Sequence, residues 1–260
     1  MGRVTGKSII VTGAGSGIGE GFARILAAEG AKVGVCDLNT EAAERVAKAI
    51  NDNGGQALAF TADVSKRDQV KTGFKNFVDW AGSLDVIFNN AGFNKPMHLM
   101  EVTEENWHAI MNVNGLGVLI CTQEAGRYMI AQKSGKIINT ASIAGRQGYP
   151  AFAPYCASKF AVNALTQATA RGLAEHNITC NSFAPGVVDT PLWIDLDRDL
   201  MEMGMSERPG QATEEFSAGI LRGRAATPAD LQGMALFLAS SDSDYMTGQT
   251  IMIDGGMVLV

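Results

Sequence analysis

The amino-acid sequence predicts a doubly wound, Rossmann-type α/β fold, with a seven-stranded parallel sheet flanked by helices on both faces. Three observations predict it. Seven short apolar runs recur along the chain, longer segments of helical period lie between them, and a glycine-rich turn directly follows the first run. Runs of valine, isoleucine and alanine without polar alternation are typical of parallel strands covered on both faces. Strict alternation of strand and helix indicates an open α/β sheet.

The elements can be assigned in chain order. Strands are predicted at residues 8–13, 31–37, 57–63, 84–90, 135–142, 178–186 and 249–256. Helices are predicted between them at residues 17–30, 40–53, 66–81, 104–132, 154–176 and 228–240. Asn114 lies inside the longest helical segment, where asparagine is a poor helix former, so it indicates a local distortion. We find no linker or repeat and expect one domain over residues 1–260.

One segment, at about 191–226, breaks the alternation of strand and helix. It has helical character but contains no predicted strand. Insertions of this length in a compact domain are commonly lids or binding loops. The alternative is an ordinary pair of helices packed on the edge of the fold.

The composition excludes several classes of function. A net charge of −6 argues against nucleic-acid binding, which requires a basic patch. No apolar run is long enough for a signal peptide or a membrane span, so we expect a soluble, cytoplasmic protein. The four cysteines and three histidines show no metal-binding spacing, and no catalytic metal is expected. Cys36 and Cys180 fall inside predicted strands, where a small buried thiol is the expected role.

The glycine-rich turn "TGAGSGIGEGFARILAAEG" follows the first strand and opens a helix. Gly13, Gly17 and Gly19 let the backbone turn tightly and approach a pyrophosphate, which could rest on the N–H groups of the helix start. The spacing is G-x-x-x-G-x-G rather than the G-x-G-x-x-G of most dinucleotide folds, so this turn alone is a weak indication.

The second strand strengthens the prediction of a dinucleotide site, because "AKVGVCD" ends in Asp37. A carboxylate at this position can accept hydrogen bonds from both hydroxyls of an adenosine ribose and would repel a 2′-phosphate. The nearby Ser16 and Leu38 supply no compensating cation. NAD is therefore favoured over NADP, although Asp37 could also be a solvated acid at a strand end.

Two further stretches end predicted strands at the same edge of the sheet. Asp63 in "TADV" could accept from the adenine amino group, and the asparagines of "NNAG" (89–92) could tie strand ends together. Ala91 and Gly92 leave room for a flat ring or a ribose. Each stretch alone could be turn chemistry, but together they line the edge where open α/β sheets bind ligands.

The sequence "YCASK" (155–159) places a tyrosine and a lysine four residues apart, on one face of a predicted helix. Such a pair is common by chance. Ser142, at the end of the fifth predicted strand, lies thirteen residues earlier and could meet Tyr155.

With these motifs in order, the sequence resembles the short-chain dehydrogenase/reductase (SDR) family over essentially its whole length. The matching residues are "TGAGSGIG" (12–19), Asp63, "NNAG" (89–92), Asn114, Ser142, "YCASK" (155–159), "PG" (185–186) and "IDGG" (253–256). Within the family it resembles NAD-dependent polyol (sorbitol-type) and acetoin/meso-2,3-butanediol dehydrogenases.

The resemblance implies roles for particular residues. Tyr155 would be the acid/base, Lys159 would lower its pKa and bind the nicotinamide ribose, Ser142 would hold the substrate oxygen, and Asn114 would support a water relay. The residues implied in NAD binding are Gly13, Ser16, Gly17, Ile18, Gly19, Asp37, Leu38, Asp63, Val64, Asn90, Ala91, Gly92, Tyr155, Lys159, Pro185, Gly186, Val188 and Thr190.

The resemblance also places the substrate lid at 191–226 and implies a homotetramer. An apolar wall is expected from Leu192, Trp193, Met201, Met203 and Met205, unless the methionines only pack beneath the lid. Asn94, His98, Gln147 and Tyr149 are candidates to meet substrate hydroxyls.

The leading interpretation is an NAD-dependent dehydrogenase that oxidises a secondary alcohol, either a small polyol or a vicinal diol, reversibly to the ketone. One alternative is a carbonyl reductase of the same family that acts on a hydroxysteroid or a 3-oxoacyl thioester. A different class, a catalytically silent NAD-binding regulator, is disfavoured by the complete set of Ser142, Tyr155 and Lys159.

Overall fold

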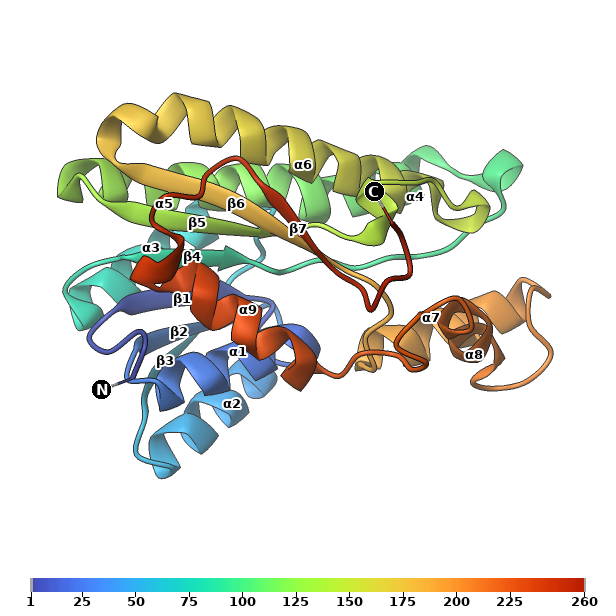
Figure 1. Cartoon of the computed structure of the whole chain (residues 1–260), viewed down its shortest axis with the longest axis horizontal. Helices are drawn as coiled ribbons and strands as arrows, with labels where there is room; N and C mark the ends of the chain where they lie inside the picture. Colours follow the sequence, from blue (N-terminus) through green and yellow to red (C-terminus); the bar gives the residue numbers. More distant parts are fainter. Residues whose placement is uncertain (1, 260) are drawn as a thin grey trace.

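Seven parallel strands form one sheet in the order β3-β2-β1-β4-β5-β6-β7 in the computed structural model, which describes residues 2–259 (Figure 1). The strands are β1 (Ser8–Thr12), β2 (Lys32–Asp37), β3 (Gln56–Thr61), β4 (Val86–Asn89), β5 (Gly135–Thr140), β6 (Ile178–Pro185) and β7 (Thr250–Ile253). The strand order reverses between β1 and β4, because the chain builds outward first on one side of β1 and then on the other. Ligands in such sheets bind beyond the carboxyl ends of the strands at this switch point.

Helices cover both faces of the sheet, as the sequence predicts (Figure 1). One face packs against α1 (Gly17–Ala28), α2 (Thr40–Asp52) and α9 (Pro228–Ala239), and the other against α3 (Arg67–Ala81), α5 (Val118–Gln132) and α6 (Ala153–Leu173). Neighbouring residues of one strand serve the two cores, since Ile9 and Val11 face the first set of helices and Ile10 faces the second. No helix among residues 2–259 is long and apolar enough to cross a membrane.

The predicted helix 104–132 is interrupted, as Asn114 indicates. It consists of α4 (Glu104–Met111), a π-helical turn at Asn112–Gly117 and then α5. Asn114 is fully buried and uses its side chain outside the helix, with hydrogen bonds to Phe93 and Ser158. The wider turn therefore occurs where a side chain is directed at a neighbouring segment.

Several predicted boundaries are wrong by one to three residues. Strands β3 and β5 end at Thr61 and Thr140, so Asp63 and Ser142 lie two residues beyond their strands rather than at the ends. Ser142 instead precedes a short 3-10 turn at Ile143–Gly145, and its hydroxyl accepts from the backbone N–H of Ala144 at 3.1 Å. Local hydrogen bonding by serine competes with the strand ladder.

The segment 191–226 contains two helices, α7 (Pro191–Glu202) and α8 (Gln211–Ser217), which project beyond the end of the sheet (Figure 1). Its two ends are joined by a short bridge, in which Asp189 N–H donates to the Ala226 carbonyl at 2.8 Å and Ala226 N–H donates to the Val187 carbonyl at 2.9 Å. The buried carboxylate of Asp197 accepts from the N–H groups of Gly210 and Ala212, at 2.6 and 3.1 Å. The insertion is thus a tied unit rather than a loose loop.

A pair of glycine substitutions tests how closely α3 packs on the sheet, with a glycine of α9, on the other face, as the control. A Cβ at Gly73 of α3 would lie 2.5 Å from the Phe60 ring, whereas a Cβ at Gly233 of α9 would meet nothing within 4 Å. We expect Gly73→Ala to lower the free energy of unfolding by about 1–3 kcal/mol through overpacking. Gly233→Ala should raise it by up to about 1 kcal/mol through helix propensity. Urea denaturation measures both, and equal effects in the two variants would contradict this account.

Candidate active site

A cavity of about 520 Å³ opens at the carboxyl edge of the sheet and brings most of the predicted residues together. Its wall includes seventeen of the eighteen predicted cofactor residues, Tyr155 and Lys159 among them, and the predicted Ser142. Those cofactor residues, apart from Tyr155 and Lys159, are Gly13, Ser16, Gly17, Ile18, Asp37, Leu38, Asp63, Val64, Asn90, Ala91, Gly92, Pro185, Gly186, Val188 and Thr190, with Thr140 beside them. The predicted Gly19 and Asn114 do not line the cavity.

The glycine-rich turn forms a cradle between β1 and α1. Gly13 and Gly17 have φ angles of +62° and +54°, which residues with a side chain rarely adopt. Gly19 serves packing, because a Cβ there would lie 2.1 Å from the Gly13 carbonyl oxygen. Ser16 precedes α1 without capping it through its side chain, so the N–H groups of the first turn keep their capacity for an anion. This cradle fits a pyrophosphate.

Asp37 joins the end of β2 to the glycine-rich turn. Its carboxylate accepts from Gly15 N–H at 2.7 Å and from Asn39 N–H at 2.9 Å, and it lines the cavity. A carboxylate has further lone pairs, which suit two ribose hydroxyls. The residues of this cavity therefore fit NAD.

A cation that was not predicted from the sequence, Arg45, binds the same glycine as Asp37. The Arg45 guanidinium donates to the Gly15 carbonyl at 2.7 Å and to the Glu20 carboxylate at 2.8 Å. The hydrogen bond from Arg45 is the main cause that lowers the pKa of Glu20. Arg45 is thus already paired with an acid.

Asp63 is engaged with its own loop. Its carboxylate accepts from the backbone N–H and the hydroxyl of Ser65, at 2.9 and 2.7 Å. The side chain lines the cavity, and its contact with adenine stays a prediction.

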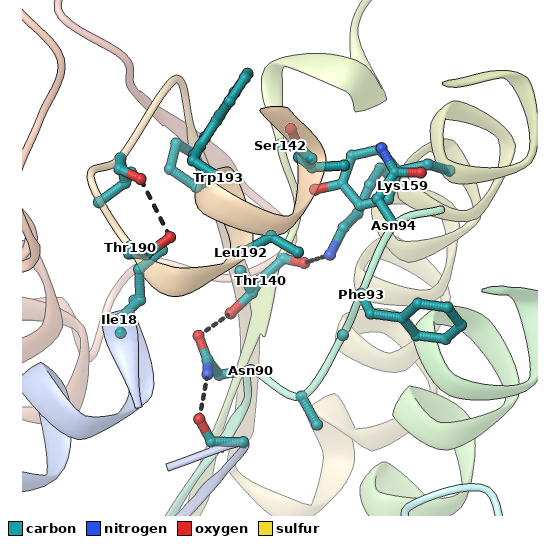
Figure 2. Close-up of a pocket in the computed structure, with 18 of the residues that line it drawn as sticks. Ile18, Asn90, Phe93, Asn94, Thr140, Ser142, Lys159, Thr190, Leu192 and Trp193 are labelled. Atoms are coloured by element: carbon teal, nitrogen blue, oxygen red, sulfur yellow. Dashed lines mark hydrogen bonds between the residues drawn. The ribbon is translucent and has the colours of Figure 1, made fainter. Parts of the chain in front are cut away.

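Asn90 ties three strand ends together (Figure 2). Its Nδ2 donates to the carbonyls of Thr12 and Gly13 at 3.0 and 3.2 Å, and its Oδ1 accepts from the Thr140 hydroxyl at 3.4 Å. Asn90 itself follows β4, so one amide spans β1, β4 and β5. The "NNAG" asparagines were predicted to do this.

Lys159 is held by the same edge of the sheet (Figure 2). Its Nζ donates to the Thr140 carbonyl at 2.8 Å and lies 5.4 Å from the centroid of the Tyr155 ring. Both side chains come from α6, one helical turn apart. The "YCASK" spacing therefore places the phenol and the ammonium in one site, as predicted.

Burial shifts the pKa values of both groups toward their neutral forms. It lowers the pKa of the Lys159 ammonium to about 8 and raises the pKa of the Tyr155 phenol to about 12. A hydrogen bond with Ser142 acts against the rise at Tyr155. In a dry site an isolated phenolate is unfavourable, so Tyr155 needs positive charge beside it to work as a base near neutrality.

Asn114 lies outside the cavity wall and holds two segments that border it. Its Oδ1 accepts from Phe93 N–H at 3.1 Å, and its Nδ2 donates to the Phe93 carbonyl at 2.9 Å and to the Ser158 hydroxyl at 3.1 Å. A Cβ at Gly92 would lie 3.0 Å from Asn114 Oδ1 and 3.7 Å from Lys159 Nζ, so Gly92 separates the two. Asn114 braces the chain after β4, and its part in a water relay stays a prediction.

The substrate side of the cavity differs from the sequence prediction in several residues. Asn94, Tyr149, Leu192 and Trp193 line the cavity, whereas His98, Gln147, Met201, Met203 and Met205 do not. His98 is turned toward the lid, with Nε2 3.3 Å from the Met203 carbonyl. Gln147 is exposed and donates to the Tyr149 hydroxyl at 2.6 Å.

Aromatic side chains form the wall of the cavity that was expected to face the substrate, and half of them were not predicted from the sequence. Trp193 and Phe216 have ring centroids 5.4 Å apart, Phe216 and Phe152 5.7 Å, and Tyr149 lies 6.0 Å from Phe216. These rings come from α7, α8 and the turn before α6. Nothing in the local sequence around Phe152 or Phe216 signals that the three segments meet.

A family model described as short chain dehydrogenase matches residues 7–200. A diacetyl reductase that forms (S)-acetoin, from Staphylococcus epidermidis, is 40% identical over 97% of this chain and 98% of the relative. A sorbitol dehydrogenase from Cereibacter sphaeroides is 38% identical over 98% of both chains. A 3-oxoacyl-[acyl-carrier-protein] reductase from Thermotoga maritima is 38% identical over 99% of this chain and 100% of the relative.

Solved structures agree with this fold. NAD⁺-bound xylitol dehydrogenase superposes with a TM-score of 0.92 at 31% identity, covering 98% of this chain and 100% of the other. A gluconate 5-dehydrogenase from Burkholderia cenocepacia, in complex with NADP and tartrate, gives a TM-score of 0.88 at 36% identity, covering 98% and 96%. Similar chains thus bind either dinucleotide, so the choice for this chain depends on its own residues.

The low pKa of Lys159 predicts a pH-dependent gain in stability. In the unfolded chain a lysine titrates near ~10.4, so above pH 8 the unfolded state binds more protons than the folded state and stability rises with pH. We expect the wild type to gain about 1–2 kcal/mol in free energy of unfolding between pH 7 and 9.5 relative to Lys159→Met. Denaturant titrations at several pH values measure this difference, and parallel pH profiles for the two proteins would contradict it.

Proposed function

This chain belongs to the short-chain dehydrogenase family and is an oxidoreductase of secondary alcohols and ketones, and we propose that it is an NAD-dependent dehydrogenase of small polyols or vicinal diols. One observation carries the proposal. The half-buried Tyr155 and the buried Lys159 share a cavity wall with Ser142, and the same cavity continues into the glycine cradle and Asp37. A proton-transfer group therefore lies beside a place for a dinucleotide.

The proposed reaction assigns a separate task to each side chain. During oxidation the Tyr155 oxygen takes the hydroxyl proton of the alcohol, while Ser142 holds the substrate oxygen by a hydrogen bond. Lys159, fixed on the Thr140 carbonyl, places positive charge near the phenol and favours the phenolate. A bound NAD⁺ would supply the acceptor for the hydride that leaves the alcohol carbon. In the reverse direction Tyr155 returns its proton to the carbonyl oxygen.

A same-family alternative is a reductase of bulkier ketones, such as a hydroxysteroid or a 3-oxoacyl thioester. The aromatic wall favours this alternative more than the sequence did, because it offers apolar contact area. A substrate panel that contains all these classes separates the two. A silent regulator is disfavoured because Ser142, Tyr155 and Lys159 all line one cavity.

The homotetramer implied by the family resemblance also remains a proposal. The exposed apolar side chains of Trp107, Leu116 and Phe160, on and between α4 and α6, support it. Light scattering that gives the mass of a monomer would contradict it.

The first prediction of this proposal concerns Tyr155. We expect Tyr155→Phe to reduce NAD⁺-dependent oxidation of a polyol or diol by about 10²- to 10⁴-fold, because the proton acceptor is removed. Binding of NADH, followed by its fluorescence, should stay within about twofold because the ring remains. Initial rates across polyols, vicinal diols and hydroxysteroids measure the effect. A variant as active as the wild type would exclude Tyr155 as the acid/base.

The second prediction concerns the choice of dinucleotide. The wild type should bind NADH more tightly than NADPH, because Asp37 repels a 2′-phosphate and Arg45 is paired with Glu20. Asp37→Ser should weaken NADH binding by about tenfold, because it removes two hydrogen bonds to the ribose hydroxyls. It should also narrow the difference in affinity between NADH and NADPH, because the repulsion of the 2′-phosphate is lost. The double variant Asp37→Ser with Glu20→Gln should narrow the difference in affinity further, because Arg45 would lose its ion pair with Glu20 and could bind the 2′-phosphate. Fluorescence titration measures each affinity, and a wild type that prefers NADPH would overturn the assignment.

A further inference from the structure

We propose that Asn94 recognises a hydroxyl group on the carbon next to the reacting carbon, and that the substrates are vicinal diols and α-hydroxyketones with apolar substituents rather than sugar alcohols. This inference rests on the proposed function, because it assumes oxidation of a secondary alcohol between Ser142 and Tyr155. Within that function it narrows the substrate class and names a residue that determines it.

The amide of Asn94 is buried without a partner. Only 8% of the residue is exposed, and its side-chain oxygen has no hydrogen bond to any described residue. It lines the same cavity as Ser142 and Tyr155, and Figure 2 shows it on the same side of the pocket as Ser142 and Lys159. Buried amides in proteins are normally hydrogen-bonded. A residue that lines a cavity, and whose buried amide oxygen has no partner among the described residues, is suited to a ligand.

The chain on both sides of Asn94 is fixed, so the amide cannot easily turn away to find another partner. Asn114 binds both the N–H and the carbonyl of Phe93, at 3.1 and 2.9 Å. On the other side, Lys95 pairs with the buried Asp199 of α7 at 3.1 Å, and its carbonyl accepts from Asn106 at 3.0 Å. The loop therefore holds Asn94 in place before any substrate arrives, which lowers the entropic cost of binding.

The chemistry of an amide matches a hydroxyl. An asparagine side chain offers an acceptor and donors, and a hydroxyl can both donate and accept, so the contact forms with either orientation of the amide. Ser142 and Tyr155 would hold the reacting oxygen. A second oxygen on the adjacent carbon then comes within reach of a third polar group on the same wall.

The rest of the substrate wall is unsuited to further hydroxyls. It consists of the aromatic rings of Tyr149, Phe152, Trp193 and Phe216, together with Leu192 and Leu196. The one hydroxyl in this aromatic cluster, on Tyr149, accepts a hydrogen bond from Gln147, so it could donate to one substrate hydroxyl but not satisfy several. A sugar alcohol would bury several hydroxyls against these rings without partners, which is unfavourable. Methyl, alkyl or aryl substituents would instead gain contact area there.

The test compares a diol with the alcohol that lacks its second hydroxyl. We would measure kcat/KM with NAD⁺ for each stereoisomer of 2,3-butanediol, for 2-butanol and for sorbitol, using the wild type, Asn94→Leu and Asn94→Ser. Asn94→Leu keeps similar volume but removes both polar atoms. We expect it to lower kcat/KM for the preferred butanediol by about 10- to 100-fold and for 2-butanol by less than about threefold. Asn94→Ser, which retains a hydroxyl, should recover part of the loss.

A binding measurement supplements the rates. In the Tyr155→Phe background, with NAD⁺ present, quenching of the fluorescence of Trp193 should report butanediol binding, and Asn94→Leu should weaken that binding by a similar factor. Thermal melting of each variant checks that it folds.

The outcomes separate the two levels of the proposal. Equal losses for butanediol and 2-butanol would show that Asn94 has only a structural role and would overturn this inference alone. A wild type that prefers sorbitol to butanediol would overturn the inference that the substrates carry apolar substituents. A wild type that oxidises no alcohol and reduces no matching ketone, while still binding NADH, would overturn the proposed function and this inference with it.

Discussion

The active-site arrangement depends on one side chain, the amide of Asn90. It joins the ends of β1 and β5 to the segment that follows β4, and so it fixes Thr140 relative to the glycine-rich turn. Thr140 in turn supplies the carbonyl that holds Lys159 at 2.8 Å. Because Lys159 and Tyr155 share a rigid helix, the position of the phenol relative to the glycine cradle follows from this short chain of hydrogen bonds. The backbone pairing of β1, β4 and β5 brings the groups to one edge, and the amide adds side-chain links between the strand ends there.

The same geometry explains why the site is electrostatically unfavourable when considered alone. Burial raises the pKa of Tyr155 and lowers that of Lys159, so each group is shifted away from the charged form that the proposed alcohol oxidation would require. Positive charge beside Tyr155 would stabilise its phenolate, and the phenolate would in turn stabilise the Lys159 ammonium. Catalytic sites commonly keep such unfavourable groups because the rest of the fold stabilises them. Here the two hydrophobic cores on either side of the sheet supply that stability.

The sequence predicted the features that are local or periodic, and it missed those that arise where distant segments meet. Strand and helix alternation gave the sheet, and the spacing in "YCASK" placed Tyr155 and Lys159 together, because both signals lie within one element. Even the distortion near Asn114 was visible, since asparagine conflicts with its helical surroundings. Phe216, Phe152 and the pairing of Arg45 with Glu20 were not, because their roles come from tertiary contacts between elements. For the same reason His98 and Gln147 were wrongly expected at the cavity wall.

The two ends of the cavity are under different constraints. The cofactor end is built by strand ends and a helix start, where glycine geometry leaves little room for change. The substrate end is built by α7, α8 and the loop after β4, which are tied to the body through contacts such as Lys95–Asp199 and the bridge at Ala226. Side chains on such tied insertions can change without disturbing the sheet. The reaction type therefore follows from the sheet edge, whereas the substrate must be inferred from the few side chains that the insertion and the loop turn inward. Among these side chains, the buried amide of Asn94 is the most informative. Buried amides are normally hydrogen-bonded, so one without a partner among the described residues indicates a contact with a ligand.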